Sequence, residues 1–457
     1  MKAPLGINDL CRLFLVWVSI VLSTVFLFSR SPDHLPHPTK HKNISDMNIP
    51  WASAVPIPAP DPCAGRYIYV YDLPEKFNKD IVRDCHSLSL WTDMCPFITN
   101  SGLGPRLNNT YKDGDGVLQE TGWYLTNQWM LDIIFHTRMK QYGCLTTDYS
   151  LASAIFVPYY SGLDVTRYLW DHEVARRDKL GMDLVKWLRQ RSEWEARGGR
   201  VHFLVSGRST WNLQRGLDEW WGSKFLVIPE VQNMTVLTVE RRPSGDNEFA
   251  IPYPTYFHPS EVSQVAEWQE KVRSSERPWL FSFAGGRRPD YPHMVRNHLI
   301  DQCAQSSRCK LHECHTGGVE CNSASNLMKL FMQSKFCLQP PGDTSARRSI
   351  FDSMLAGCVP VFFRNESASV QYKWHMPREF ESFSVYIWED EVNAGQVRPE
   401  DVLLQYGDEK IREMREEVIR MIPTLIYKDP RNSSENFMDA FDVAVNGVLQ
   451  RVRESLV

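Results

Sequence analysis

Residues 336–363 read FCLQPPGDTSARRSIFDSMLAGCVPVFF, and this stretch holds the clearest structural pattern in the chain. Apolar residues open and close it, a Pro-Pro-Gly-Asp turn follows the first apolar run, and the centre has helical periodicity. The pattern predicts a strand over Phe336–Gln339, a helix over Ser345–Leu355 and a strand over Val359–Phe363. A strand, a helix and a second strand in this order form a parallel unit, which is typical of α/β proteins.

The same alternation extends in both directions from this unit. Further strands are predicted over Arg66–Asp72, Ala154–Tyr160, Val201–Ser206, Phe225–Ile228, Trp279–Phe283, Lys310–Glu313 and Ser384–Trp388. Helices are predicted over Thr121–Tyr142, Tyr168–Ala196, Tyr291–Ala304, Ser323–Ser334, Asp408–Ile426 and Glu435–Val452. The prolines of Pro252-Tyr253-Pro254 suit a domain junction. We therefore expect two doubly wound, Rossmann-like domains facing a cleft, over residues 63–258 and 259–430, with a C-terminal helix over 431–457.

The beginning of the chain predicts a membrane anchor. Leu13–Phe28 is an uncharged apolar run of sixteen residues, which as a helix is about 24 Å long. Basic residues precede it, so we expect residues 1–12 to be a cytosolic tail and residues 13–29 to be an uncleaved signal anchor. A cleaved signal peptide is the alternative, but Phe28-Ser29-Arg30 is a poor cleavage site. Residues 30–62 hold eight prolines and predict an extended stem, which places the rest of the chain in the lumen.

Composition excludes several classes of protein. Of the 457 residues, 43% are hydrophobic and 23% are charged, which argues against a disordered chain or a multi-span membrane protein. The net charge of −4 argues against nucleic acid as a partner. Five N-x-S/T sequons predict glycosylation in the lumen, at Asn43, Asn108, Asn233, Asn365 and Asn432.

The eleven cysteines suit an oxidising compartment. Four of them cluster around two histidines, at Cys303, Cys309, Cys314 and Cys321. A zinc site is one interpretation of this cluster, but no C-x-x-C pair is present, so disulfides are favoured. Cys85 and Cys95 are a further candidate pair, whereas Cys337 and Cys358 lie in apolar strands and are interpreted as core residues.

An anion site is predicted at the start of the helix Ser345–Leu355, where free N–H groups and a partial positive charge are available. Arg347 and Arg348 lie at the end of the helix dipole that disfavours cations, which makes sense if they meet a diphosphate. Asp352 shares a helix face with Arg348 and can hold sugar hydroxyls, although a salt bridge between the two is the alternative. A second glycine–arginine turn, Phe283-Ala-Gly-Gly-Arg-Arg-Pro-Asp290, adds Arg288. The expected nucleotide-sugar site comprises Arg288, Asp343, Thr344, Arg347, Arg348 and Asp352.

Several of these motifs resemble the exostosin-like glycosyltransferases, and within them the plant xyloglucan galactosyltransferase group. The matching stretches are Tyr67–Pro74, Phe156–Trp170, Pro252–Pro259, Phe283–Pro289, the four clustered cysteines and Phe336–Phe363. The resemblance implies a type II Golgi membrane enzyme of the GT-B type with two Rossmann-like domains. It also implies transfer of galactose from UDP-galactose to xylosyl side chains of xyloglucan, with inversion and without a metal. UDP-galacturonate as the donor and a non-catalytic glycan-binding scaffold are the alternatives, and a complex with other Golgi glycosyltransferases is possible.

Inverting transfer needs a base on the acceptor hydroxyl, expected from the first domain. Asp164 is the first candidate, because it follows a predicted strand and Ser161-Gly162, and a helix N-cap is its alternative role. His258 is the second candidate, with a structural role near the hinge as its alternative. Asp113-Gly114-Asp115 resembles a metal-binding D-x-D signature but lies in a polar loop, so no metal cofactor is expected. Three tryptophans are candidates for stacking on sugar rings, namely Trp91, Trp170 and Trp211.

Overall fold

The computed structural model describes residues 61–107, 116–216, 220–291, 293–314, 323–431 and 437–455. All of these belong to one compact unit, Pro60–Val457. The predicted tail, anchor and most of the stem lie outside the described residues, and so do Asn43, Asn108, Asn432, the D-x-D loop and Cys321. Within the described ranges, no helix has both the length and the apolar character needed to cross a bilayer.

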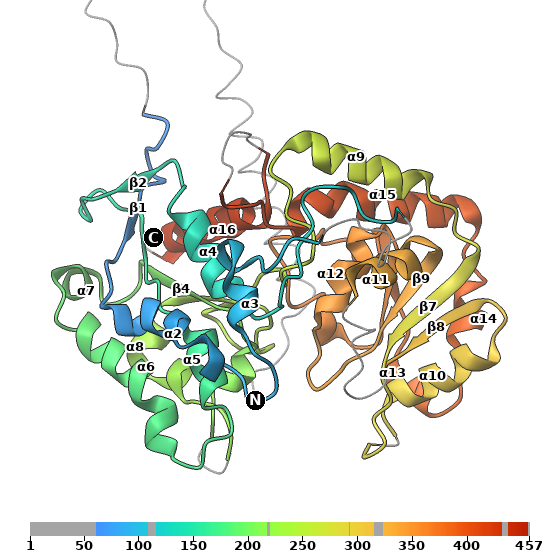
Figure 1. The fold of residues 1–457 in the computed structure, drawn as a ribbon, viewed down its shortest axis with the longest axis horizontal. Helices are drawn as coiled ribbons and strands as arrows, with labels where there is room; N and C mark the ends of the chain where they lie inside the picture. The colour runs from blue at the N-terminus through green and yellow to red at the C-terminus, as the bar shows by residue number, and fades with distance from the viewer. Residues whose placement is uncertain are drawn as a thin grey trace, which may run out of the picture. The chain divides into compact units, whose positions relative to one another are not determined.

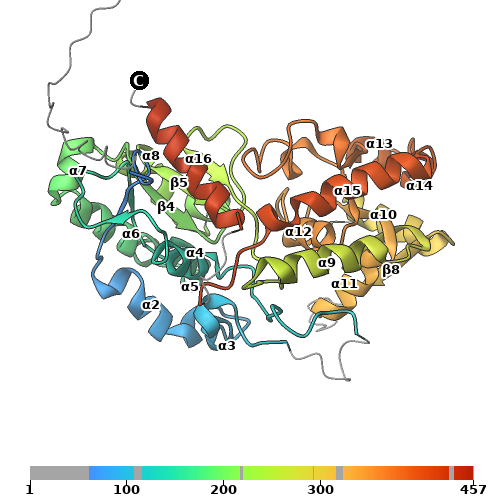
Figure 2. The ribbon, with the colours of Figure 1, turned by 90° about the horizontal axis from the view of Figure 1, so that it is seen from above.

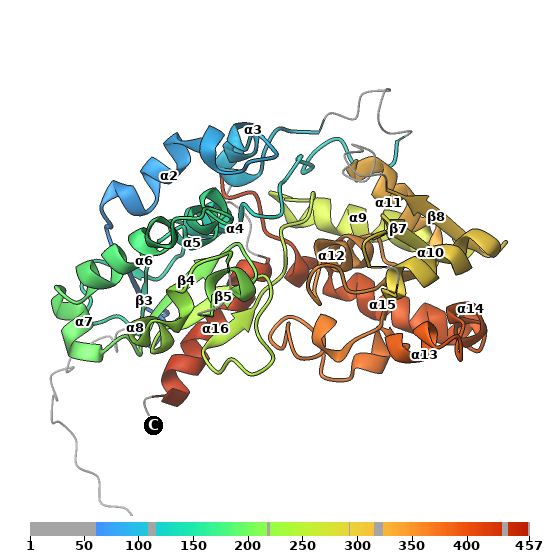
Figure 3. The same cartoon turned by 90° about the horizontal axis from the view of Figure 1, so that it is seen from below.

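The first half of this unit contains a six-stranded parallel sheet with the order β2-β1-β3-β4-β5-β6. Its strands are β1 (Ile68–Val70), β2 (Leu145–Thr146), β3 (Ala154–Phe156), β4 (His202–Ser206), β5 (Thr235–Thr238) and β6 (Glu248–Ala250). Its helices are α2 (Lys79–Arg83), α3 (Cys95–Ile98), α4 (Leu131–Met139), α5 (Ser161–Arg167), α6 (Val174–Leu188), α7 (Ser192–Arg197) and α8 (Pro229–Gln232). Strands β4 and β5 are buried along their whole length, as expected for parallel strands covered on both faces. Figure 3 shows α4 and α5 near β4, which both helices contact.

One strand prediction in this half is wrong. Phe225–Ile228 was expected to be a strand, but Phe225–Val227 forms a 3-10 helix. Pro229 begins α8 directly afterwards, because proline fits the first turn of a helix and cannot donate to a strand ladder. The strand of this region is β5 instead, which begins at Thr235.

The second half contains a five-stranded parallel sheet with the order β11-β10-β9-β7-β8. Its strands are β7 (Trp279–Gly285), β8 (Cys309–Glu313), β9 (Ser334–Gln339), β10 (Val359–Phe362) and β11 (Val385–Tyr386). Its helices are α9 (Val262–Ser274), α10 (Val295–Gln305), α11 (Ala324–Met332), α12 (Arg348–Leu355), α13 (Glu389–Asn393), α14 (Pro399–Leu403) and α15 (Asp408–Leu425). The stretch at 336–363 forms β9, α12 and β10 as predicted, with Phe336 opposite Val359. Figure 1 shows β9, β7 and β8 side by side. Two parallel sheets with connecting helices confirm the predicted α/β class.

The last helix, α16 (Ala440–Ser455), packs with the first sheet rather than the second. Arg451 of α16 donates to Thr235 of β5 at 3.1 Å, and Figure 2 shows the red helix beside β4 and β5. Asp439, just before α16, is fully buried and pairs with Arg138 of α4 at 3.2 Å. The chain therefore crosses back to the first sheet after α15.

The two sheets share one apolar core along part of their junction. Ile350 and Phe351 of α12 belong to the same cluster of buried side chains as Val239, which follows β5. The Tyr372 hydroxyl donates to the Val239 carbonyl at 2.9 Å, and Gln371 exchanges two hydrogen bonds with the Arg241 backbone. Two domains facing a cleft were expected, and along this part of the junction the two halves share a common core.

Disulfides confirm part of the cysteine interpretation. The bonds are Cys63–Cys144, Cys85–Cys95, Cys303–Cys309 and Cys337–Cys358, and Cys314 is disulfide-bonded as well. Disulfides rather than zinc are therefore present in the described part of the cluster. The interpretation of Cys337 and Cys358 as simple core residues is wrong, because the two lie 5.9 Å apart between their Cα atoms and are joined. The bond links β9 to the residue before β10.

Candidate functional site

Two arginines converge on Gly342, in the loop between β9 and α12. Arg347 donates to the Pro340 carbonyl at 2.9 Å, and Arg296 of α10 donates to the Pro341 carbonyl at 3.4 Å. A Cβ atom on residue 342 would lie 2.9 Å from Nη2 of Arg296 and 3.0 Å from Nη2 of Arg347. Glycine lets both guanidinium groups lie this close, because a side chain at this position would push them away. The loop is thus built so that two cations come close to its backbone.

This arginine cluster carries little compensating negative charge. Its third member, Arg288, pairs with the exposed Asp343 at 2.6 Å, from the glycine–arginine turn after β7. Among the described residues, no carboxylate forms an ion pair with Arg296 or Arg347. Burial lowers the pKa of Arg347 to about 9 and lowers the pKa of Arg296 as well. Removing a cation from water is costly, so this cluster of Arg288, Arg296 and Arg347 is suited to an anionic ligand.

Arg348 and Asp352 lie elsewhere than expected. The Arg348 guanidinium stands 3.6 Å from the ring centre of Tyr256 and donates to the Thr126 carbonyl at 2.6 Å. Its Nε lies 3.3 Å from Oδ2 of Asp352, in a pair that is buried rather than on the surface. Asp352 is 2% exposed, and burial raises its pKa to about 6. Arg348 therefore contacts the first half of the unit through Nη1, and its expected role at a phosphate stays a prediction.

Glu240, which sequence analysis missed, contacts the loop between β9 and α12. It follows β5, is 1% exposed, and accepts the Ser345 backbone N–H at 3.0 Å and the Thr344 hydroxyl. The Trp211 side chain also donates to it, and burial raises its pKa. Thr344 therefore contacts a carboxylate of the first half of the unit, and Asp343 contacts Arg288. The signal that could have found Glu240 was its position just beyond a strand, but that strand was not predicted.

The two predicted bases are buried and fully engaged. Oδ2 of Asp164 accepts the Tyr159 hydroxyl at 2.6 Å, and Oδ1 pairs with Arg167. Asp164 lies inside α5 rather than at its N-cap, and burial raises its pKa. The structure thus gives this carboxylate an internal ion pair in place of the expected opening onto a cleft.

His258 is held at the point where the chain crosses back to the first sheet. Its Nδ1 lies 2.7 Å from the Tyr427 carbonyl, and its Nε2 lies 3.0 Å from both the Thr255 carbonyl and the Thr126 hydroxyl. Burial lowers its pKa to about 4. This arrangement matches the structural alternative, because neither ring nitrogen faces an open surface.

A further carboxylate positions the loops that follow β3 and β4. Asp132 of α4 accepts the backbone N–H groups of Gly162 at 3.1 Å and Gly207 at 2.8 Å. Burial raises the pKa of Asp132 to about 7. Arg208, next in the chain, stacks 3.9 Å from the ring centre of Trp129 and donates to Thr166 at 2.8 Å. These contacts fix the backbone beside Glu240.

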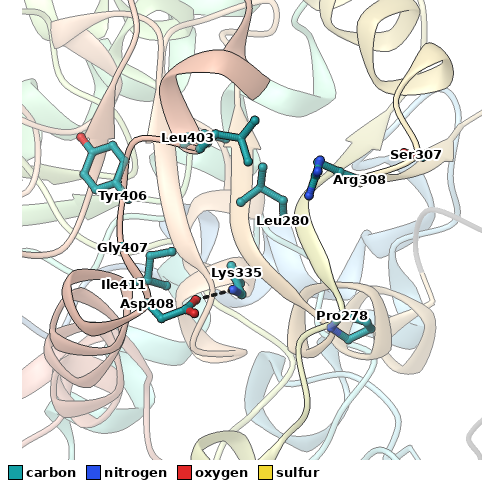
Figure 4. Close-up of a pocket in the computed structure, with 11 residues that line it drawn as sticks. Pro278, Leu280, Ser307, Arg308, Lys335, Leu403, Tyr406, Gly407, Asp408 and Ile411 are labelled. Carbon is teal, nitrogen blue, oxygen red and sulfur yellow. Dashed lines mark hydrogen bonds and ion pairs between the residues drawn. The ribbon is translucent and has the colours of Figure 1, made fainter.

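A hollow of about 590 Å³ lies at the other end of the strands of the second sheet, away from the arginine cluster. It is lined by Leu280, Arg308, Leu403 and Tyr406, among others, and the Lys335–Asp408 ion pair of 2.6 Å lies within it (Figure 4). Ligands of parallel sheets bind beyond the carboxyl ends of the strands, whereas this hollow lies at their amino ends. The arginine cluster is therefore the better candidate site.

Of the described sequons, Asn233 and Asn365 are exposed, as glycosylation requires.

Comparison with known proteins agrees with these observations. The profile of the Exostosin GT47 domain matches residues 62–400, which covers most of the chain. The chain belongs to the exostosin GT47 family. Among its relatives, the xyloglucan galactosyltransferase MUR3 of Arabidopsis thaliana is 52% identical over 86% of this chain and 63% of that protein. A probable xyloglucan galactosyltransferase of the same plant, GT12, is 48% identical over 93% of this chain and 84% of that protein.

The chain thus spans somewhat less than two thirds of the length of MUR3. Solved structures are far more distant from this exostosin-family chain. A glycosyltransferase from Rickettsia africae ESF-5 aligns over 85% of this chain and 98% of that one, with 9% identity and a TM-score of 0.34. This likeness is too weak to carry a conclusion.

Proposed function

We propose that this protein transfers galactose from UDP-galactose to xylosyl side chains of xyloglucan. Its membership of the exostosin GT47 family and its similarity to named xyloglucan galactosyltransferases support the chemistry and the acceptor. The observation that carries the donor assignment is the arginine cluster around Gly342. A guanidinium group can donate two parallel hydrogen bonds to phosphate oxygens, and Arg296 and Arg347 form no ion pair with a carboxylate among the described residues.

In this proposal the arginine cluster binds the diphosphate of the UDP-sugar. Negative charge develops on the diphosphate as the bond to the sugar breaks. Cations that are already in place stabilise that charge without reorganising, and Arg296 among them is buried. Because Arg288, Arg296 and Arg347 supply this charge, the proposed reaction needs no metal ion.

Glu240 is the proposed base. It comes from the first half of the unit. Its carboxylate accepts hydrogen bonds from Thr344 and Ser345, which follow Gly342 in the same loop. Its burial raises the pKa, which makes the carboxylate a stronger proton acceptor. In a single in-line displacement it would take the proton of the acceptor hydroxyl as that oxygen attacks the anomeric carbon, with inversion. Glu240 is preferred to Asp164 and His258 in this role because its hydrogen bonds go to the loop that carries the arginine cluster, whereas Asp164 bonds Tyr159 and Arg167.

The finer points of architecture and location are part of the same proposal. We call residues 340–347, between β9 and α12, the donor loop. Two Rossmann-like halves that meet at this loop support the GT-B assignment. The apolar run Leu13–Phe28, the disulfides and the exposed sequons support a type II protein of the Golgi membrane with its catalytic part in the lumen. Association with other Golgi glycosyltransferases stays a prediction.

The test uses residues 60–457, the compact unit, secreted from a eukaryotic host. The protein is incubated with galactose-free xyloglucan oligosaccharides and, separately, UDP-galactose, UDP-glucose and UDP-galacturonate, with EDTA present, and products are weighed by mass spectrometry. We expect one added hexose from UDP-galactose alone. Transfer from UDP-galacturonate would change the donor, and loss of activity in EDTA would overturn the metal-free scheme. UDP binding without transfer from any donor would favour the scaffold alternative.

A further inference from the structure

Four tryptophans gather beyond the carboxyl ends of β3 and β4. Trp170 follows α5, Trp211 lies in the 3-10 helix Thr210–Leu213, and Trp220 and Trp221 end the next loop. The ring centre of Trp170 lies 4.8 Å from that of Trp220 and 5.9 Å from that of Trp221. Trp220 is 67% exposed and Trp211 is 44% exposed. Exposed apolar side chains in one place mark a binding surface more often than isolated ones do.

Backbone hydrogen bonds tie the three segments that carry these rings. The Gly222 N–H donates to the Leu169 carbonyl at 2.8 Å, and the Ser223 N–H donates to the Asn212 carbonyl at 2.9 Å. Gly222 has a φ of +76°, and a Cβ there would lie 2.6 Å from the Asn212 oxygen. A glycine is needed for both reasons. Trp170, Trp211 and Trp221 are therefore each next to a residue that makes such a backbone contact, and Trp220 is two residues from one.

A buried polar network supports the loop from the other side. The Gly222 carbonyl accepts Nη1 of Arg177 at 3.1 Å and Nη1 of Arg215 at 2.7 Å. Arg215 also donates one hydrogen bond to each carboxylate oxygen of Asp178, at 3.1 Å and 2.5 Å. Two-pronged arginine contacts of this kind fix geometry strongly. The tryptophans are thus held in place before any ligand arrives, which lowers the entropy lost on binding.

The same surface reaches the proposed catalytic centre. Trp211 donates its side-chain hydrogen bond to Glu240, and Glu240 accepts the Ser345 N–H of the donor loop. The Trp211 side chain thus links this surface directly to the carboxylate that would activate an acceptor hydroxyl.

We propose that Trp170, Trp211, Trp220 and Trp221, the tryptophan shelf, bind the neutral glucan backbone of the acceptor polysaccharide. A pyranose ring has a face of C–H groups that packs on a flat aromatic ring while its hydroxyls stay in water. Indole rings suit such a neutral chain, whereas the arginine cluster suits the charged donor. The shelf thereby holds the backbone so that a side branch reaches Glu240. This inference rests on the proposed function for the identity of the polysaccharide.

The test is electrophoresis of residues 60–457 through native gels that contain xyloglucan, which measures binding without catalysis. Trp220→Ala is compared with Trp220→Phe, which keeps an aromatic ring, and with Leu151→Ala as the control. Leu151 is 60% exposed and lies at the amino end of β3, whereas the tryptophans lie beyond its carboxyl end. We expect the dissociation constant for xyloglucan to rise about tenfold in Trp220→Ala, to rise less in Trp220→Phe and to stay unchanged in the control. The affinity for UDP should not change in any of them.

Equal retardation of Trp220→Ala and Leu151→Ala would overturn the shelf, as would a native protein that xyloglucan does not retard. Because Trp220 is mostly exposed, its replacement should leave the melting temperature unchanged. Trp211→Phe is the second variant, since it keeps a ring while removing the hydrogen bond to Glu240. Trp220-dependent retardation in a protein that transfers no galactose would uphold the shelf and reject the proposed function. If galactose is transferred and the KM for the acceptor is the same in Trp220→Ala as in the native protein, the proposed function is upheld and the tryptophan shelf is rejected.

Discussion

The carboxylate of Glu240 accepts the backbone N–H of Ser345 at 3.0 Å, although the two residues are 105 positions apart in the chain. This bond joins the end of β5 in the first sheet to the loop before α12 in the second. It brings a buried acid within reach of the arginine cluster at Gly342. The proposed base and the proposed donor-binding arginines thereby meet one short segment, residues 342–345.

Replacing Glu240 with Gln should abolish catalysis while sparing donor binding. The amide keeps the shape and still accepts the Ser345 N–H, but it cannot take a proton. We expect kcat to fall about 10²–10⁴-fold, the usual contribution of a general base. The measurement is steady-state transfer alongside UDP titration by calorimetry. An activity within tenfold of the native protein would remove Glu240 from the role of base.

The pH profile gives a second view of the same residue. Burial raises the pKa of Glu240, and a base acts only when it is deprotonated. The kcat/KM of the native protein should therefore fall as pH drops through that raised pKa, from a plateau at higher pH. The residual activity of Glu240→Gln should lack this acidic limb. An identical limb in both proteins would assign it to another group.

Arg296→Gln and Arg347→Gln should each weaken UDP binding. A hydrogen bond to a charged group contributes about 1.5–3 kcal/mol, so we expect a 10- to 100-fold rise in the dissociation constant. Arg308→Gln is the matched control, since Arg308 lines the hollow at the other end of the strands and pairs with Glu400. Calorimetric titration with UDP is the measurement. Equal affinities for all three variants would show that the diphosphate binds elsewhere.

Gly342→Ala should have the same effect without touching any charge. The added methyl group would stand 2.9 Å and 3.0 Å from the two guanidinium groups and push them apart. We expect weaker UDP binding with a nearly unchanged melting temperature, because both arginine side chains are able to swing away. Gly407→Ala is the control, as nothing lies within 4 Å of a Cβ there. Native affinity in Gly342→Ala would contradict the close approach of the arginines to the ligand.

The buried acid Asp352 makes a prediction about stability. Burial raises its pKa in the folded state to about 6, above the unfolded value near 3.8. The folded protein therefore binds more protons between these values, and its free energy of unfolding should fall as pH rises through that window. Asp352→Asn cannot titrate and should show a flatter dependence between pH 4 and pH 7. Urea unfolding at several pH values measures this, and equal slopes would refute it.

Sequence alone predicted the second sheet well because its signals are local. The Pro-Pro-Gly-Asp turn and the helical spacing after it fixed β9, α12 and β10 within a few residues. In the first sheet, Thr235–Thr238 is only four residues long and lacks clear alternation, while the apolar Phe225–Ile228 is followed by Pro229. Short buried strands of this kind are specified by packing rather than by pattern.

The candidate site was harder to predict, because its contacts are distant in the sequence. Arg296 lies within a helix, where an arginine is usually solvated, and only the fold turns it toward Pro341. Arg347 and Arg348 are adjacent, yet Arg347 has an extended backbone with a φ of −160° and begins the helix. Their side chains therefore lead to Pro340 and to Thr126, in different halves of the unit. Neighbours in sequence thus acquire separate tasks.

The bond between Cys337 and Cys358 turns the donor loop and α12 into a closed covalent ring. Thiols stay reduced in the cytosol and are oxidised in exported proteins, so this ring is expected to close only in an oxidising compartment. Residues 337–358 include Gly342 and Arg347, and their loop is tethered at both ends by the disulfide. The proposed donor site should therefore depend on oxidation of the protein for its final geometry. A chain made in a reducing cytosol is expected to bind UDP more weakly than the same chain after export.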